Sequence, residues 1–165
     1  MSPTDNGSAA WLSQEAYDRL QAEMDALIAG RPAIAAEINA RREEGDLKEN
    51  GGYHAAREEQ GKQEGRIRYL TEFLRTAKVG TAPTAGAVAP GMVVTIHFFD
   101  DPDDTEEFLL GSREIAATTE LTVYSPESAL GAAILGAKPG QQVTYTAPSG
   151  AKIDVTVVKF APFAG

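Results

Sequence analysis

A break in composition divides this chain into two segments with different patterning. Residues 80–90 read Gly-Thr-Ala-Pro-Thr-Ala-Gly-Ala-Val-Ala-Pro, small residues with two prolines that end helices and offer little to pack. Before this segment the apolar residues recur with helical periodicity, and after it β-branched and aromatic residues form short runs between turns. We therefore expect a flexible tail over residues 1–12, a helical arm over 13–79, a linker over 80–90 and a sheet domain over 91–165.

The helical segment carries a seam of heptad spacing on two successive helices. We expect the first helix to run from an N-cap at Ser13 to Glu44, with a kink where Gly30 and Pro32 weaken it. Its seam positions are Leu20, Met24, Leu27, Arg31, Ile34, Ile38 and Arg41. Those of the second helix are Tyr53, Ala56, Gln60, Gln63, Ile67, Leu70, Leu74 and Ala77.

The two seams have opposite polarity gradients. The first is apolar early and polar late, and the second is polar early and apolar late, so antiparallel pairing sets residues 20–28 against 67–74. The prediction is an antiparallel coiled coil with a packed base and a hydrophilic tip. A hairpin used only for dimerisation is the alternative, but a dimerising coiled coil keeps its seam apolar throughout.

The second half predicts an antiparallel sheet with one short helix, which makes the whole chain α+β. The expected strands span residues 91–99, 106–111, 121–124, 142–146 and 152–160. We expect the helix over residues 128–135, with Gly136 as its stop, and a hairpin turn at Pro148-Ser149-Gly150.

Composition excludes several classes of protein. The chain has no Cys and only two His, which excludes disulfide frameworks, thiolate chemistry and a multi-His metal cage. A net charge of −9 argues against a protein that holds nucleic acid by charge alone, and 11 of the 15 cations lie in residues 1–80. No apolar run is long enough to span a membrane and residues 1–10 lack the pattern of a secretory signal, so we expect a cytoplasmic protein that binds no membrane.

The loop between the two helices holds the candidate chemistry. Asp46 and Glu49 stand three residues apart, a spacing that puts both carboxylates on one side of a turn. One interpretation is a capping box that satisfies free N–H groups of the second helix. The other is a pair of oxygen ligands for Mg²⁺, which takes one or two protein carboxylates and completes its shell elsewhere. The spacing alone leaves both open.

The tip motif resembles that of the Gre transcript-cleavage factors, of the GreA type. It is carried by Glu44-Gly45-Asp46-Leu47-Lys48-Glu49-Asn50 and by Tyr53-His54-Ala55-Ala56-Arg57-Glu58, and the likeness extends from Trp11 to Phe160. The resemblance implies a bacterial elongation factor with an FKBP-like C-terminal domain that docks on RNA polymerase. Its coiled coil would enter the polymerase secondary channel, where the polymerase hydrolyses backtracked RNA. The factor itself would not be an enzyme.

The resemblance also assigns roles to residues. Asp46 and Glu49 would be the catalytic pair, holding a Mg²⁺ shared with the polymerase that the free protein does not bind tightly. Contacts with the RNA 3′ end or the channel wall would come from Arg41, Arg42, Lys48, Tyr53 and Arg57. Ser125 and Pro126 would dock on the polymerase. Nascent RNA and template DNA would be met only within the elongation complex, and we expect a monomer.

Two other functions are alternatives to this one. A Gre-like protein that occupies the channel without promoting cleavage would have an altered acidic set at the tip, whereas this motif is intact. A peptidyl-prolyl isomerase of the FKBP fold would line its pocket with a Trp, and we expect Trp11, the single Trp, to lie outside the second domain.

Overall fold

A helical hairpin forms one of two compact units, and a small sheet forms the other. The computed structural model describes residues 10–46, 49–80 and 85–163. Residues 18–76 make up the hairpin unit, and the described parts of 1–17 and 77–165 make up the sheet unit. Among the described residues, no helix combines the length and apolarity needed to cross a bilayer.

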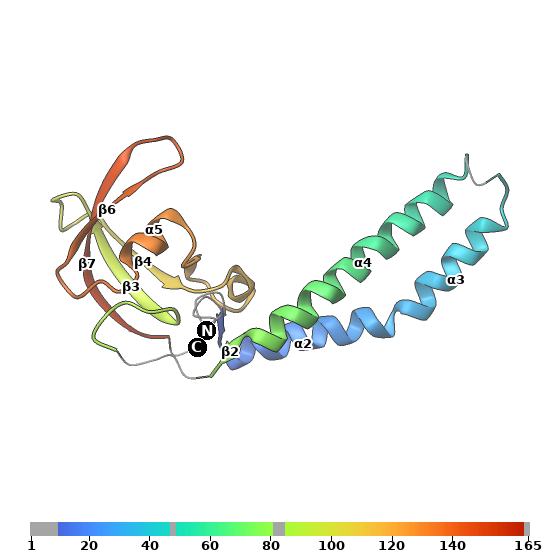
Figure 1. Cartoon of the computed structure of the whole chain (residues 1–165), viewed down its shortest axis with the longest axis horizontal. Coiled ribbons are helices and arrows are strands. Elements are labelled where there is room, and N and C mark those ends of the chain that lie inside the picture. Colours follow the sequence, from blue (N-terminus) through green and yellow to red (C-terminus); the bar gives the residue numbers. More distant parts are fainter. Residues whose placement is uncertain (1–9, 47–48, 81–84, 164–165) are drawn as a thin grey trace, which may run out of the picture. The chain divides into compact units, whose positions relative to one another are not determined.

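The hairpin consists of α2 (Gln14–Ala29), α3 (Arg31–Arg42) and α4 (Gly51–Thr76) (Figure 1). The predicted N-cap is confirmed, since Ser13 Oγ accepts the N–H of Ala16 at 3.2 Å. The break between α2 and α3 falls at Gly30, which confirms the predicted kink. The first helical stretch ends at Arg42, two residues before the expected end at Glu44.

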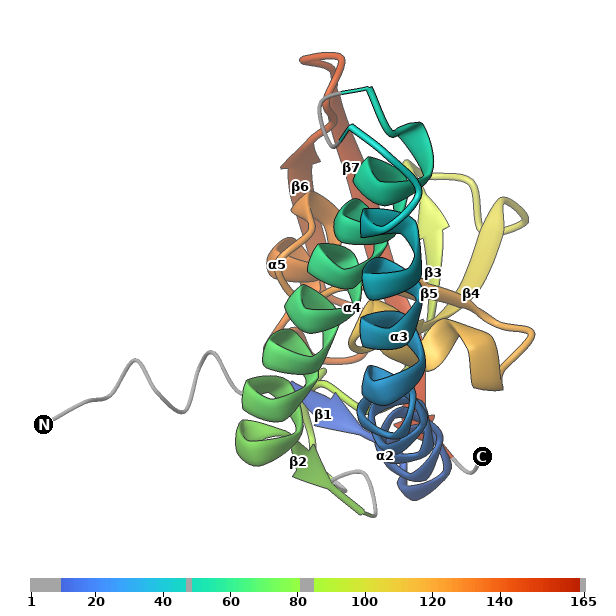
Figure 2. The ribbon, with the colours of Figure 1, turned by 90° about the vertical axis from the view of Figure 1, so that its right-hand side faces the viewer.

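The antiparallel pairing of the arm is confirmed by contacts across the hairpin. Arg66 on α4 donates to Glu23 on α2 at 2.6 and 2.9 Å, and apolar residues of the predicted seam are buried. These are Leu20, Ile67, Leu70 and Leu74 toward the base, and Ile38 and Ala56 toward the tip. Figure 2 looks onto the tip end of the hairpin, where α3 and α4 lie side by side.

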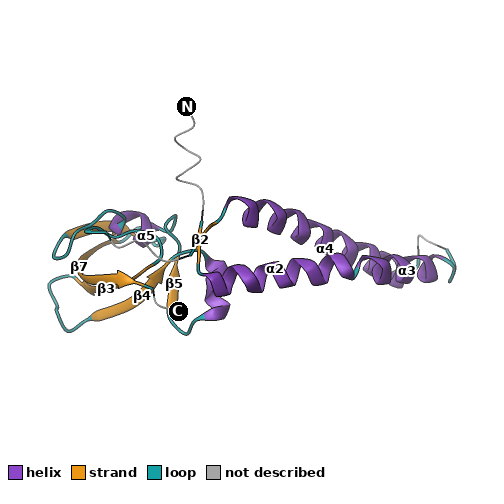
Figure 3. Ribbon diagram, turned by 90° about the horizontal axis from the view of Figure 1, so that it is seen from below, coloured by secondary structure: helices purple, strands orange, loops and turns teal. Residues whose placement is uncertain are grey.

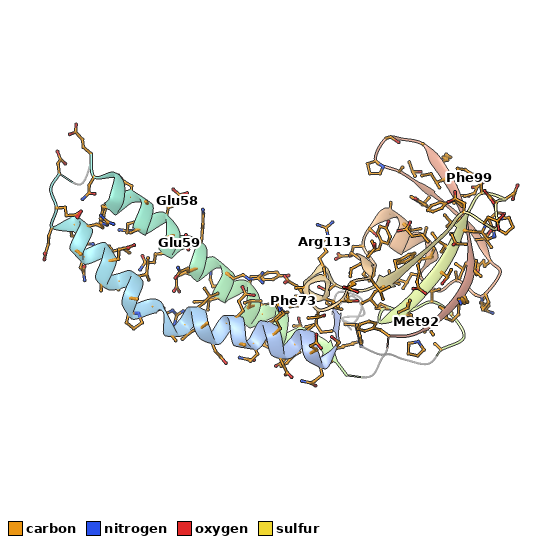
Figure 4. The ribbon with its side chains drawn as sticks, turned by 180° about the vertical axis from the view of Figure 1, so that it is seen from behind. Glu58, Glu59, Phe73, Met92, Phe99 and Arg113 are labelled. Carbon is orange, nitrogen blue, oxygen red and sulfur yellow. The ribbon has the colours of Figure 1, made fainter. Side chains whose placement is uncertain are left out.

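The sheet has five strands in the order β5-β4-β3-β7-β6. The strands are β3 (Met92–Phe98), β4 (Thr105–Leu110), β5 (Thr122–Tyr124), β6 (Gln142–Thr146) and β7 (Lys152–Pro162), coloured orange in Figure 3. The helix α5 (Ala129–Ile134) contributes Leu130 and Ile134 to a core with Val94, Phe108 and Val157. Figure 4 labels Met92, the first residue of β3, and Phe99, the residue directly after its end.

The expectation of a wholly antiparallel sheet is wrong at one edge, where β5 pairs parallel to β4. Parallel neighbours cannot be joined by a tight turn, and here the 3-10 helix η1 (Arg113–Thr118) lies in the connection. The sheet is therefore mixed, within an α+β fold that otherwise follows the prediction.

The last two residues of the expected tail form a strand. Trp11–Leu12 (β1) pairs parallel with Lys78–Val79 (β2), and the Trp11 ring meets Phe163 edge-on at 6.3 Å. Trp11 is 8% exposed and belongs to the sheet unit, so the expectation that it lies outside the second domain is wrong. A strand of two residues is too short to leave a periodic signal in the sequence.

Candidate functional site at the arm tip

The tip begins where the backbone leaves α3. The N–H of Glu43 donates to the Asn39 carbonyl at 3.3 Å, and that of Glu44 donates to the Arg41 carbonyl at 3.1 Å. Gly45 then takes a φ of +147°, a conformation that L side chains rarely adopt. Gly45 therefore turns the chain away from the first helical stretch.

The two predicted ligands, Asp46 and Glu49, stand at the two ends of one turn. The N–H of Glu49 donates to the Asp46 carbonyl at 3.2 Å, and both residues are exposed. Lys48, a predicted RNA contact, lies outside the described residues. Two exposed carboxylates suit a hard cation that keeps part of its own shell. Within the described parts of the chain, no three His, Asp or Glu side chains gather around a common point.

Asn50, rather than Asp46, caps α4. Asn50 Oδ1 accepts the N–H of Tyr53 at 2.9 Å, and the Asn50 carbonyl accepts that of His54 at 3.1 Å. An N-cap residue directly precedes its helix, and α4 begins at Gly51, so Asp46 stands too early in the chain. Asp46 is therefore not the N-cap residue of α4, and the role of its carboxylate as a magnesium ligand stays a prediction.

The same Asn50 side chain also reaches the other helix, since its Nδ2 donates to the Arg41 carbonyl at the end of α3. The Arg41 side chain also makes contacts at this end of the hairpin. Its Nη1 lies 3.4 Å from Glu44 Oε1, and it packs over Gly52, where an added Cβ would lie 3.1 Å from Arg41 Cδ. Sequence reasoning missed Asn50, although an Asn directly before Gly-Gly at a helix start is a capping signal.

Tyr53 brings two further predicted residues together. The guanidinium carbons of Arg42 and Arg57 lie 5.8 and 6.0 Å from the centroid of the Tyr53 ring, and Arg57 Nη1 donates to Tyr53 Oη at 3.1 Å. Hydrogen bonding from Arg42, and then from Arg57, lowers the pKa of the Tyr53 hydroxyl. An aromatic ring beside two cations is an arrangement that contacts single-stranded nucleic acid. We call these three residues the Arg-Tyr-Arg cluster.

A hollow of about 190 Å³ opens between α3 and α4 beside this cluster. Its lining consists of Ala35, Ile38, Asn39, Arg42, Arg57 and Gln60. Sequence reasoning did not identify it because its walls come from two helices, although the polar seam position at Gln60 is a sign of loose packing there.

The predicted docking residues Ser125 and Pro126 open a tightly held loop in the sheet unit. The Ser125 carbonyl accepts from the N–H of Ser128 at 3.0 Å and from Ser128 Oγ at 2.6 Å. Ser128 Oγ in turn accepts the N–H of Gly131 at 3.1 Å. A Cβ on Gly131 would lie 2.0 Å from the Ser125 carbonyl oxygen, so the loop requires glycine there. Both docking residues are half-buried.

Comparison with known proteins gives consistent matches along nearly the whole chain. Residues 10–79 match the family described as transcription elongation factor, N-terminal, and residues 83–162 match the C-terminal family of GreA/GreB transcription elongation factors. Transcription elongation factor GreA of Mycolicibacterium smegmatis is 60% identical over 157 residues, which cover 94% of this chain and 96% of that protein. GreA of Saccharopolyspora erythraea is 59% identical over 156 residues, with the same coverage. The crystal structure of GreA factor homolog 1 of Thermus thermophilus covers 93% of this chain and 99% of its own, at 21% identity and a TM-score of 0.42.

Proposed function

Because the chain belongs to the GreA/GreB family of transcription elongation factors, we propose that it binds bacterial RNA polymerase and stimulates the polymerase's own cleavage of backtracked RNA. The chain is then a factor and not an enzyme, since the hydrolytic centre belongs to the polymerase. The observation that carries this proposal is the exposed turn that holds Asp46 and Glu49 together at the end of a helical hairpin.

The arm supplies reach. The 26 residues of α4 span about 39 Å at about 1.5 Å per residue, a length suited to entering a channel. Buried Leu20, Leu70 and Leu74 pack the base of the hairpin, whereas the tip exposes polar side chains. This gradient lets a narrow arm stay folded while its end remains hydrophilic, as entry into the polymerase secondary channel requires.

The tip supplies two carboxylates. Asp46 and Glu49 would hold a Mg²⁺ together with groups of the polymerase, and the residues at the tip fit this role because both are exposed oxygen ligands in one turn. When bound in such a site, magnesium activates water or stabilises a leaving oxygen in phosphodiester hydrolysis. The chain offers only part of a coordination shell here, so the free protein should bind magnesium weakly.

The Arg-Tyr-Arg cluster is the best-supported RNA contact. Arg42 and Arg57 carry exposed positive charge beside the face of Tyr53, and RNA bases stack on such rings while cations meet the phosphates. Arg41 is a weaker candidate because it pairs with Glu44 and packs over Gly52. Lys48 remains a proposed contact. The RNA 3′ end and the template would be met only inside the elongation complex.

The sheet unit supplies the anchor. The loop that starts at Ser125 and Pro126 is held by hydrogen bonds to Ser128 and by the close approach of Gly131, so it presents a fixed surface to the rim of the polymerase channel. We infer that the factor acts as a monomer in the bacterial cytoplasm, where its polymerase works.

A purified, backtracked elongation complex tests the proposal. Addition of the chain should accelerate release of a short 3′ RNA fragment and restore elongation from the new end. The Asp46→Asn variant, which keeps the side-chain shape and removes the charge, should bind the complex without this acceleration. Binding by the wild-type chain with no accelerated cleavage would instead identify a channel-occupying regulator.

A further inference from the structure

We propose that Asn50 is a positioning residue for the Asp46–Glu49 pair, acting by joining the end of α3 to the start of α4 with one side-chain amide. The inference rests on the proposed function, because it concerns how the tip is held for cleavage. It adds a positioning role for a side chain that is not itself a ligand.

Asn50 makes two bonds in two directions. Its Oδ1 accepts the N–H of Tyr53, in the first turn of α4, at 2.9 Å. Its Nδ2 donates to the carbonyl of Arg41, in the last turn of α3. Both groups are backbone atoms at helix ends, which lack partners within their own helices. One planar amide therefore satisfies a donor at the start of one helix and adds a second hydrogen bond to a carbonyl at the end of the other, since the Arg41 carbonyl also accepts the N–H of Glu44.

This bridge fixes the base of the loop that carries the carboxylates. Residues 43–50 connect the helices, and Glu49 directly precedes Asn50 in the chain. The turn from Asp46 to Glu49 is closed by the backbone bond between these two residues. Holding Asn50 against both helices thus sets where that turn stands relative to the hairpin axis. Catalytic constellations lose rate when their supporting contacts allow small displacements.

Few side chains can replace both bonds. Asp and Ser cap helices as well as Asn, so they keep the bond from Tyr53. Neither can keep the second bond, because the Asp carboxylate has no donor and the Ser hydroxyl is shorter than the amide. Asn50→Ser and Asn50→Asp therefore separate the cap from the bridge. Asn50→Ala removes both.

The positioning role predicts a specific kinetic pattern. Asn50→Ser should keep the wild-type melting behaviour, because α4 remains capped, and should keep the factor concentration that gives half-maximal stimulation. Its maximal cleavage rate in the backtracked complex should fall about tenfold, as expected for a loosened catalytic group. The maximal cleavage rate with Asn50→Asp should fall by a similar factor. Because this variant adds a negative charge and Asn50→Ser does not, a similar loss in both separates loss of the bridge from an electrostatic effect. Asn50→Ala should show both the lower rate and a lower melting temperature.

The outcomes are distinct. If Asn50→Ser folds normally and stimulates cleavage at the wild-type maximal rate, the bridge does not position the carboxylates and the inference is wrong. A rate loss seen only in Asn50→Ala would reduce Asn50 to a helix cap and likewise overturn it. If the wild-type chain itself gives no stimulation, it is the proposed function that fails. Hydrogen exchange at the Tyr53 amide, protected in Asn50→Ser and exposed in Asn50→Ala, verifies that the two variants differ in the cap.

Discussion

Arg31 and Glu64 form a two-pronged ion pair across the arm, directly after the break between α2 and α3. Arg31 Nε and Nη2 donate to the two carboxylate oxygens of Glu64 at 2.8 and 3.0 Å. The pair lies where the seam becomes polar, so a charged contact takes over from apolar packing at this level of the hairpin. Hydrogen bonding to Arg31 lowers the pKa of the Glu64 carboxyl.

Removing this pair should loosen the tip half of the arm without unfolding the base. In a double-mutant cycle, Arg31→Ala and Glu64→Ala should show a small favourable coupling, because the two side chains are 48% and 34% exposed and solvent screens the pair. At about 1 M salt, where the Debye length is about 3 Å, most of this coupling free energy should vanish. Thermal melts at low and high salt measure the coupling. The Glu58–Lys62 pair within α4, at 3.9 Å, is the control and should couple more weakly. Equal coupling free energies in the two cycles would show that the Arg31–Glu64 pair stabilises the arm no more than an ion pair within one helix.

Neutralising either tip carboxylate should make cleavage demand more magnesium. Asp46→Asn and Glu49→Gln remove a negative charge while keeping size, so both should retain the melting temperature and lose most of the stimulation at low magnesium. Raising the magnesium concentration should recover part of it, since the ion is held less tightly and not excluded. Cleavage rate against magnesium concentration is the measurement. Glu43→Gln, which removes a charge beside the loop, should behave as wild type, and an equal loss there would point to a general charge effect.

Truncating Arg57 should weaken contact with the RNA 3′ end. Arg57→Ala removes one of the two cations beside Tyr53 together with its hydrogen bond to the Tyr53 hydroxyl. Crosslinking from the 3′ nucleotide of a backtracked transcript to the arm should fall several-fold, while binding to polymerase should change little. The matched control is Arg75→Ala, which removes another exposed arginine of α4, one paired with Glu72 near the base. Unchanged crosslinking in Arg57→Ala would show that the cluster is solvent-exposed charge without an RNA contact.

The sheet unit should lose stability in alkali through Tyr124. Burial, followed by the hydrogen bond from Tyr124 Oη to Glu106 at 2.9 Å, raises the pKa of this hydroxyl to about 12 from its ordinary 10.0. Because the folded state holds the proton more tightly than the unfolded state, protonated Tyr124 contributes to the free energy of unfolding. This contribution is complete below pH 10 and disappears as the pH rises toward 12.

Tyr124→Phe tests this dependence. Loss of the hydrogen bond should lower the free energy of unfolding by about 1 kcal/mol at neutral pH. The difference in this free energy between the variant and wild type should shrink as the pH rises from 10 toward 12. Denaturant midpoints for both proteins across the series measure the gap. A gap that stays constant up to the highest pH would show that Tyr124 titrates alike in the folded and unfolded states.

Local chemistry explains which features were predictable from sequence. The break at Gly30 follows from residues that alter the backbone wherever they occur, and the seam follows from apolar spacing summed over many turns. The start of α4 was harder to place, because Asp46, Glu49 and Asn50 are all acceptable near a helix start. In the structure Asn50 caps the helix through the N–H of Tyr53, and its second bond, to the Arg41 carbonyl, depends on the tertiary pairing of the two helices.

The parallel pairing of β4 and β5 shows the same limit in the sheet. Strand propensity located both strands, but their relative direction depends on the path of the connection through η1. In the Arg-Tyr-Arg cluster, Tyr53 and Arg57 are neighbours on α4, but only the hairpin brings Arg42 to Tyr53. Residue type and spacing therefore identified the cations individually without showing which of them act together.

The β1–β2 ladder gives the arm the character of an insertion. Lys78 donates to the Ala10 carbonyl at 2.8 Å and Leu12 pairs with Val79, so the chain leaves the sheet unit and re-enters it at neighbouring points. A hairpin with joined ends can gain or lose whole heptads while the strands that frame it stay paired. The length of the arm is thereby separable from the folding of the sheet unit: inserting or removing a heptad pair leaves the pairing of Trp11–Leu12 with Lys78–Val79 in place.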